Sequence, residues 1–135
     1  MKTLAERFPR PDLVNRINLM AKTVGGAAEL ISLEADEMIE ASRRVTGLSD
    51  FGERIDGDWQ GRLKGLVASL DAEADLNVMG RLQVRQEILR CLQSRLYLTK
   101  KITEQPDILN EDIIEPFIIT GTGRSGTTIT LELLS

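Results

Sequence analysis

The segment from Phe117 to Leu134 constrains the fold most, because it places a strand, a turn and a helix start within eighteen residues. Pro116 disfavours helix in the residue before it, and the run FIIT at 117–120 is aromatic and β-branched. The run lacks the alternation of a half-buried strand, so it predicts a strand buried on both faces, as in helix-covered parallel sheets. A lone strand of this kind needs partners, and no second convincing strand accompanies it. We therefore expect an α/β domain that begins here and continues beyond Ser135.

The turn that follows, Gly121 to Thr128, has the composition of an anion cradle. Its glycines permit close backbone approach, and the first amides of the new helix have no acceptor within the helix. Hydroxyls at Ser125, Thr127 and Thr128 and the guanidinium of Arg124 suit phosphate or sulfate oxygens. The alternative interpretation is a turn without a ligand. The agreement of spacing, donor groups and preceding strand favours phosphate binding.

The same turn nearly matches the nucleotide-binding pattern GxxxxGK[ST]. Gly121 and Gly126 provide its glycines, and Thr128 takes the Ser/Thr position, but Thr127 stands where lysine is required. A nucleoside triphosphatase needs that lysine at the β and γ phosphates, whereas a site for a single phosphate can function without it. A kinase or another nucleotide-binding enzyme with a degenerate motif is therefore the second interpretation.

The stretch FIITGTGRSGTTITLELL resembles the 5′-phosphate-binding strand, loop and helix of sulfotransferases that use 3′-phosphoadenosine-5′-phosphosulfate (PAPS). The likeness is strongest to bacterial members with an RSGTT-type loop. The upstream stretches SLEADEMIEASRRVTGLSDFGE and PDILNEDIIEPFIITG also resemble the helical N-terminal extension of these enzymes. The resemblance implies an α/β, P-loop-like sulfotransferase fold, of which this chain is the N-terminal part. It also implies transfer of a sulfuryl group from PAPS to a small hydroxyl or amine acceptor, without a metal.

The resemblance further implies roles for individual residues of the turn. Arg124 is the expected catalytic residue, because it occupies the position where sulfotransferases place a lysine or arginine that reaches the phosphosulfate bridge and stabilises charge on the leaving phosphate. The residues expected to hold PAPS are Gly123, Arg124, Ser125, Gly126, Thr127 and Thr128. Gly123 departs from related loops, which often carry proline there. The general base and the 3′-phosphate contacts are expected beyond Ser135, so this chain alone is expected to be inactive.

The preceding residues, 1–112, predict a helical N-terminal segment, and residues 113–135 predict the start of the sulfotransferase domain. Asn77 is expected to cap the longest helix, which Pro106 ends, while Gly47 ends an earlier helix that Ser32 caps. Trp59 falls on the buried face of a further helix and is expected in the core. A third interpretation is that residues 1–105 form a helical module that binds a protein partner.

Charge and composition exclude several functions. The formal net charge of −4 gives no reason to expect nucleic acid binding, although the stretch from Arg81 to Lys101 is locally basic. That basic stretch either guides an anionic ligand or is a solvated helix face. The chain has no histidine, and its one cysteine, Cys91, lies beside the apolar stripe of the long helix, which predicts small core filler. Neither a secretory signal nor a membrane span is legible, so a cytoplasmic location is expected.

Overall fold

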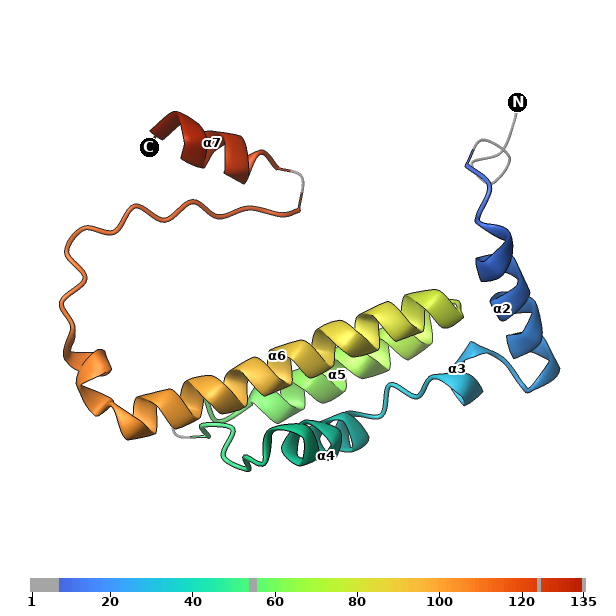
Figure 1. The fold of residues 1–135 in the computed structure, drawn as a ribbon, viewed down its shortest axis with the longest axis horizontal. Helices are drawn as coiled ribbons and strands as arrows, with labels where there is room; N and C mark the ends of the chain where they lie inside the picture. The colour runs from blue at the N-terminus through green and yellow to red at the C-terminus, as the bar shows by residue number, and fades with distance from the viewer. Residues whose placement is uncertain (1–7, 54–55, 124, 135) are drawn as a thin grey trace. The chain divides into compact units, whose positions relative to one another are not determined.

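The computed structural model describes residues 8–53, 56–123 and 125–134, and it is helical (Figure 1). The chain divides into two units, Met1–Gln105 and Pro106–Ser135. The first unit contains α2 (Asp12–Thr23), α3 (Ala27–Leu30), α4 (Ala35–Thr46), α5 (Trp59–Glu73) and α6 (Val78–Glu104). The second contains a 3-10 turn, η1 (Pro106–Asn110), and α7 (Thr127–Leu134). The division falls shortly before the expected boundary at residues 112 and 113.

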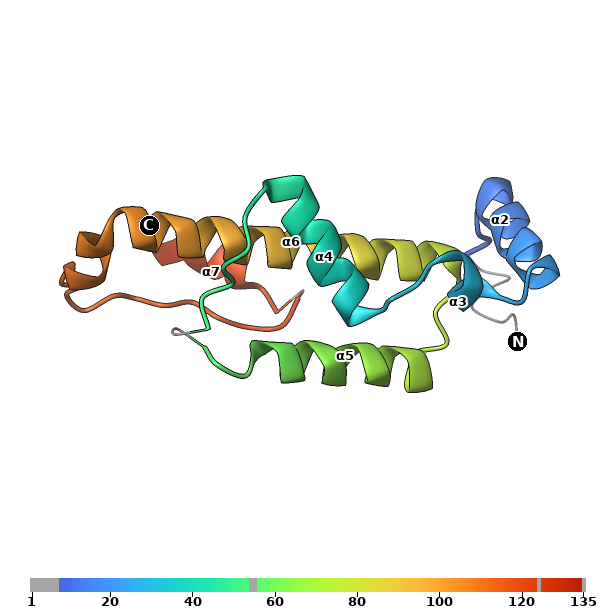
Figure 2. The same ribbon diagram turned by 90° about the horizontal axis from the view of Figure 1, so that it is seen from below.

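The longest helix of the first unit is α6. Its 27 residues span about 40 Å at a rise of about 1.5 Å per residue. The side chain of Asn77 accepts a hydrogen bond from the amide of Gly80 at 3.0 Å, which confirms the predicted cap. The helix ends at Glu104, just before Pro106, also as predicted. In both views α5 runs antiparallel to α6 (Figures 1 and 2), and α4 packs against each of them.

The core of this unit lies where α4, α5, α6 and the loop before α5 meet. Trp59 is 6% exposed and stacks on Phe51 with ring centroids 4.6 Å apart, so its predicted place in the core is confirmed. Ile88, Leu92 and Leu96 follow one another at a spacing of four and turn one face of α6 inward. The buried cluster consists of Leu33, Ala35, Met38, Ile39, Phe51, Trp59, Val67, Ile88, Leu92 and Leu96.

The ends of α4 show one prediction confirmed and one corrected. Gly47 adopts a left-handed conformation, φ 69°, and its amide donates to the carbonyl of Arg43 at 2.8 Å, so it ends the helix as expected. The N-cap, however, is Glu34 rather than Ser32. The Ser32 hydroxyl accepts from the amide of Glu34 at 3.1 Å, so it stabilises the turn before the helix instead.

The expected α/β fold is wrong. No strand or sheet forms among the residues that the structure describes, and residues 117–120 lie extended without a strand partner. Phe117 and Ile118 are 81% and 77% exposed, so the run is not buried on either face. An aromatic and β-branched run favours strand only when a neighbouring strand takes its backbone hydrogen bonds. The rest of the described chain, being helical, offers no such neighbour.

In the described ranges, no helix combines the length and the apolar character that crossing a membrane requires.

Candidate anion-binding loop

The turn between residues 117–120 and α7 folds back on itself. The amide of Ser125 donates to the carbonyl of Thr122 at 3.1 Å, which closes the turn. A Cβ built on Gly121 would overlap the hydroxyl of Ser125 and lie 3.3 Å from a methyl of Thr127. Only glycine therefore fits at position 121 without moving its neighbours. The backbone at 121 and the hydroxyl at 125 lie close together for this reason.

A second glycine sets the entry into α7. Gly126 has φ 88°, a conformation that residues with side chains rarely adopt, and α7 starts at the next residue. The amide and hydroxyl of Thr130 both donate to the carbonyl of Gly126, at 3.0 and 3.1 Å, and this fixes the first helical turn. The amides of that turn have no acceptor within the helix, and they lie at the positive end of its dipole. The arrangement can bind an oxyanion.

The hydroxyl-bearing residues of the turn differ in environment. Ser125 and Thr128 are exposed, whereas Thr127 is half-buried. Thr127 and Thr128 help to line a hollow of about 340 Å³, together with Phe117, Ile119 and Leu131. The hollow lies beside the turn and within the second unit, so the turn has both polar and apolar surroundings.

The structure brings Ser125, Gly126, Thr127 and Thr128 together at the start of α7, as the sequence predicts for a loop that leads into a helix. Gly123 has open space where a Cβ would stand and no positive φ, so its backbone does not itself require glycine. Arg124, the expected catalytic residue, lies outside the described residues. Its role stays a prediction from the sequence.

Three arginines in the basic stretch of α6 donate hydrogen bonds to main-chain carbonyls in the inter-helix loops. Arg81 donates to the carbonyl of Ile31 at 2.7 Å and pairs with Asp71 at 2.6 Å. Arg85 donates to the carbonyl of Ser32 at 2.8 Å. The Arg81 side chain is only 7% exposed. These three arginines are therefore neither free to guide an anionic ligand nor simply part of a solvated helix face.

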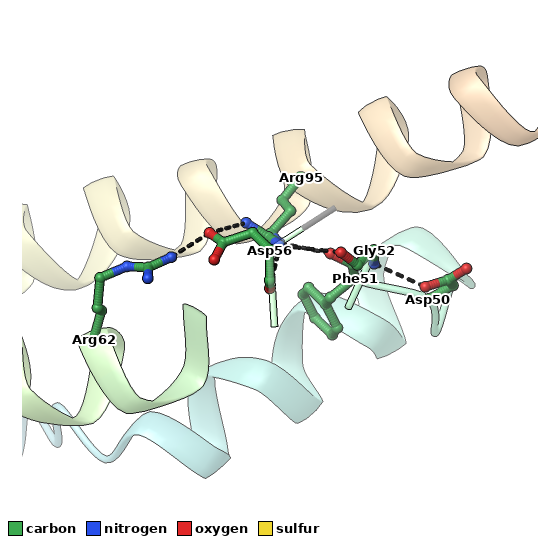
Figure 3. Close-up of polar contacts among 6 residues, drawn as sticks. All are labelled: Asp50, Phe51, Gly52, Asp56, Arg62 and Arg95. Atoms are coloured by element: carbon green, nitrogen blue, oxygen red, sulfur yellow. Dashed lines mark hydrogen bonds and ion pairs between the residues drawn. The ribbon is translucent and has the colours of Figure 1, made fainter. Parts of the chain in front are cut away.

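Arg95 makes the most extensive set of these contacts (Figure 3). Its Nε donates to the carbonyl of Phe51 at 2.6 Å, and its Nη2 lies 3.4 Å and 3.3 Å from the carbonyls of Gly52 and Asp56. The Asp56 carboxylate lies between Arg95 on α6 and Arg62 on α5, and it pairs with both. The hydrogen bond from Arg62 and the two positive charges lower the pKa of the Asp56 carboxyl below its ordinary value.

The sequence gives no signal for this cluster. The main-chain carbonyls that accept from Arg95 are 39 to 44 positions away, and no side-chain pattern encodes them. A cluster built on side-chain acceptors could have been predicted from the positions of its carboxylates or amides. Among the acceptors of Arg95, only the Asp56 carboxylate is a side chain.

Cys91 is exposed on α6, so its predicted role as core filler is wrong. Across the described ranges, no three histidine, cysteine, aspartate or glutamate side chains gather in a way that could hold a metal ion. The turn before α7 remains the arrangement best suited to a ligand.

Comparisons of the chain with protein families, with characterised proteins and with solved structures find no match.

Proposed function

We propose that the turn from Gly121 to Thr128 binds the 5′-phosphosulfate end of PAPS and that the chain is part of a sulfotransferase. The enzyme would act in the cytoplasm on a small acceptor with a hydroxyl or amine group. The observation that carries the proposal is the folded turn itself, in which Gly121 lies against the Ser125 hydroxyl and Gly126 leads into α7. The proposal rests on this local geometry and on the RSGTT sequence, not on a sheet.

The chemistry of the turn fits a phosphate group. Gly121 and Gly126 allow the close turn, and the hydroxyl-bearing residues Ser125 and Thr128 are exposed at the helix start. Hydroxyls and first-turn amides are donors that tetrahedral oxyanions accept. PAPS supplies the sulfuryl group when bound. Arg124, by the resemblance, contributes a charged fork that steadies negative charge on the phosphate side.

The direct test is equilibrium binding of adenosine 3′,5′-bisphosphate, by titration calorimetry, to the complete protein that carries this chain, because the 3′-phosphate contacts are expected beyond Ser135. We expect this nucleotide to bind without a metal and to compete with inorganic sulfate, because the turn recognises a single oxyanion. ATP with Mg²⁺ is expected to bind more weakly, since Thr127 replaces the lysine that triphosphates require. Preference for ATP with Mg²⁺ would overturn the proposal in favour of a degenerate nucleotide-triphosphate site. Binding of neither nucleotide would also overturn it.

Glycine substitutions connect the binding to the geometry of the turn. Gly121→Ala places a methyl group on the Ser125 hydroxyl, and Gly126→Ala strains a left-handed backbone, so each is expected to weaken binding at least about tenfold. Gly65→Ala is the matched control, because open space surrounds its new methyl on α5 and binding should not change. Wild-type affinity in both turn variants would show that this geometry does not hold the ligand.

A further inference from the structure

The loop before α5 contains a dipeptide that can react with itself. Asp56 and Gly57 form the one Asp–Gly pair in the sequence, and both lie outside the helices. In such a pair the glycine amide nitrogen can attack the aspartate carboxyl carbon, because glycine carries no side chain that hinders the approach. The nitrogen bonds to that carbon, and the carboxyl hydroxyl leaves with the amide proton as water. The product is a five-membered imide ring.

Opening of this ring takes back one water and has two outcomes. If water breaks the new bond, aspartate is restored. If water breaks the original bond between the Asp56 main-chain carbon and the Gly57 nitrogen, the product is isoaspartate. The main chain then runs through the former side chain, and the former main-chain carbonyl becomes a carboxylate attached directly to Cα. No oxidant, metal or enzyme is needed for either step.

The Gly57 amide is available for this attack. Gly57 is exposed, so water reaches the peptide. Within the described part of the chain, its amide has no hydrogen-bond acceptor that would hold it in place. The nucleophile of the reaction is therefore not restrained by the fold.

The Asp56 carboxyl, which is the other reactant, is restrained (Figure 3). It pairs with Arg62 on α5, and it lies 3.5 Å from Nη1 of Arg95 on α6. Ring formation requires the carboxyl carbon to turn onto the Gly57 nitrogen, so the pair with Arg62 must break first. The hydrogen bond from Arg62 and the two positive charges also lower the pKa of this carboxyl. The ionised form reacts more slowly, because the neutral acid has the better leaving group.

We propose that the Asp56–Gly57 peptide is a site of spontaneous isoaspartate formation and that the ion pair with Arg62 slows this reaction in the folded protein. The reaction removes the contact that restrains it. In isoaspartate the free carboxylate stands one carbon nearer the main chain, so it no longer reaches Arg62 from the same place. The main-chain carbonyl of Asp56, which lies 3.3 Å from Nη2 of Arg95, is also lost.

The test follows isoaspartate at position 56 while the full chain is incubated at neutral pH. After proteolytic digestion, liquid chromatography separates the isoaspartyl peptide from the ordinary peptide of equal mass. We expect slow formation in the folded wild type and faster formation in urea, where the ion pair is absent. Arg62→Gln should accelerate formation in the folded chain about twofold to fivefold, which is the range for loss of an exposed ion pair.

Gly57→Ala should slow formation below the wild-type rate, because its methyl group shields the attacking nitrogen. The fold accepts this change, since a Cβ on Gly57 lies 3.7 Å from the Glu53 carbonyl, an ordinary contact, and the backbone there has no positive φ.

Two control variants separate the ion pair from general opening of the first unit. Arg90→Gln removes an exposed pair elsewhere on α6, and Asn77→Ala weakens the start of α6 without touching Asp56. Both should isomerise at the wild-type rate. If Asn77→Ala reacts as fast as Arg62→Gln, unfolding controls the reaction and the proposal is overturned. Absence of isoaspartate at position 56 from both the wild type and Arg62→Gln, equal rates in these two chains, equal rates with and without urea, or a wild-type rate in Gly57→Ala would each overturn it as well.

Discussion

Arg95 joins α6 to the loop before α5, and its replacement by alanine tests how strongly the first unit depends on that contact. The side chain is 25% exposed, and its Nε donates to the Phe51 carbonyl at 2.6 Å. A hydrogen bond from a charged donor contributes about 1.5–3 kcal/mol. The guanidinium also lies 5.2 Å from the centre of the Trp59 ring, a cation–π contact that contributes about 0.5–1 kcal/mol. The longer contacts to Gly52 and Asp56 add little.

Arg95→Ala should therefore lower the free energy of unfolding by about 2–4 kcal/mol. The loss is a large part of the stability of a small domain, so urea denaturation followed by circular dichroism will resolve it. Arg95→Lys keeps the positive charge near Trp59 but cannot reach several carbonyls at once, and it should give an intermediate loss.

Arg90→Ala is the control for this measurement. Arg90 is 71% exposed and pairs with Glu87 within the same helix, so its removal should leave the urea midpoint nearly unchanged. If Arg95→Ala shifts the midpoint no more than Arg90→Ala does, the loop is held by other contacts, and the reasoning about Arg95 is refuted.

Two further predictions concern the start of α6 and the start of α4. Asn77→Ala removes the acceptor of the Gly80 amide and should cost about 1 kcal/mol in urea denaturation, whereas Asn77→Asp should cost little; equal losses would exclude capping as the cause. The pKa of the Glu37 carboxyl lies below its ordinary value of 4.5, because Ser32 hydrogen-bonds to it and Arg85 lies nearby. The stabilisation that follows is present above pH 4.5 and is lost as the pH falls through the lower pKa of the folded state, so Arg85→Gln should flatten the acid limb of the stability profile. An unchanged acid limb in that variant would contradict this assignment.

The helical part of the fold could be predicted because its signals are local. The Asn77 cap, the left-handed Gly47 and the position of Pro106 each act within one turn of helix, and each predicted a boundary that the structure has. Cys91 could not be placed in the same way. A residue beside an apolar stripe is buried or exposed according to which helix packs there, and sequence spacing does not specify the packing partner.

The run at 117–120 does not form the predicted strand. A strand forms only when a second segment pairs with it, and the sequence of one segment does not show whether that partner is present. Its residues have strong β preference, but that preference reflects packing against neighbouring strands, which the described residues do not provide. The turn that follows was easier to predict, since a glycine with positive φ and a close approach at Gly121 are local requirements. Its ligand is a separate question, and the binding experiments address it.

The arginine contacts of α6 have a consequence for how freely the inter-helix loops can vary. Arg81, Arg85 and Arg95 bind main-chain oxygens, which every amino acid carries. A substitution at position 31 changes the side chain but leaves the main-chain carbonyl that Arg81 binds. Position 52 is different, because Gly52 has φ 73°, which favours glycine. Where the backbone conformation suits any residue, the loop side chain can therefore vary while the arginine on the helix cannot.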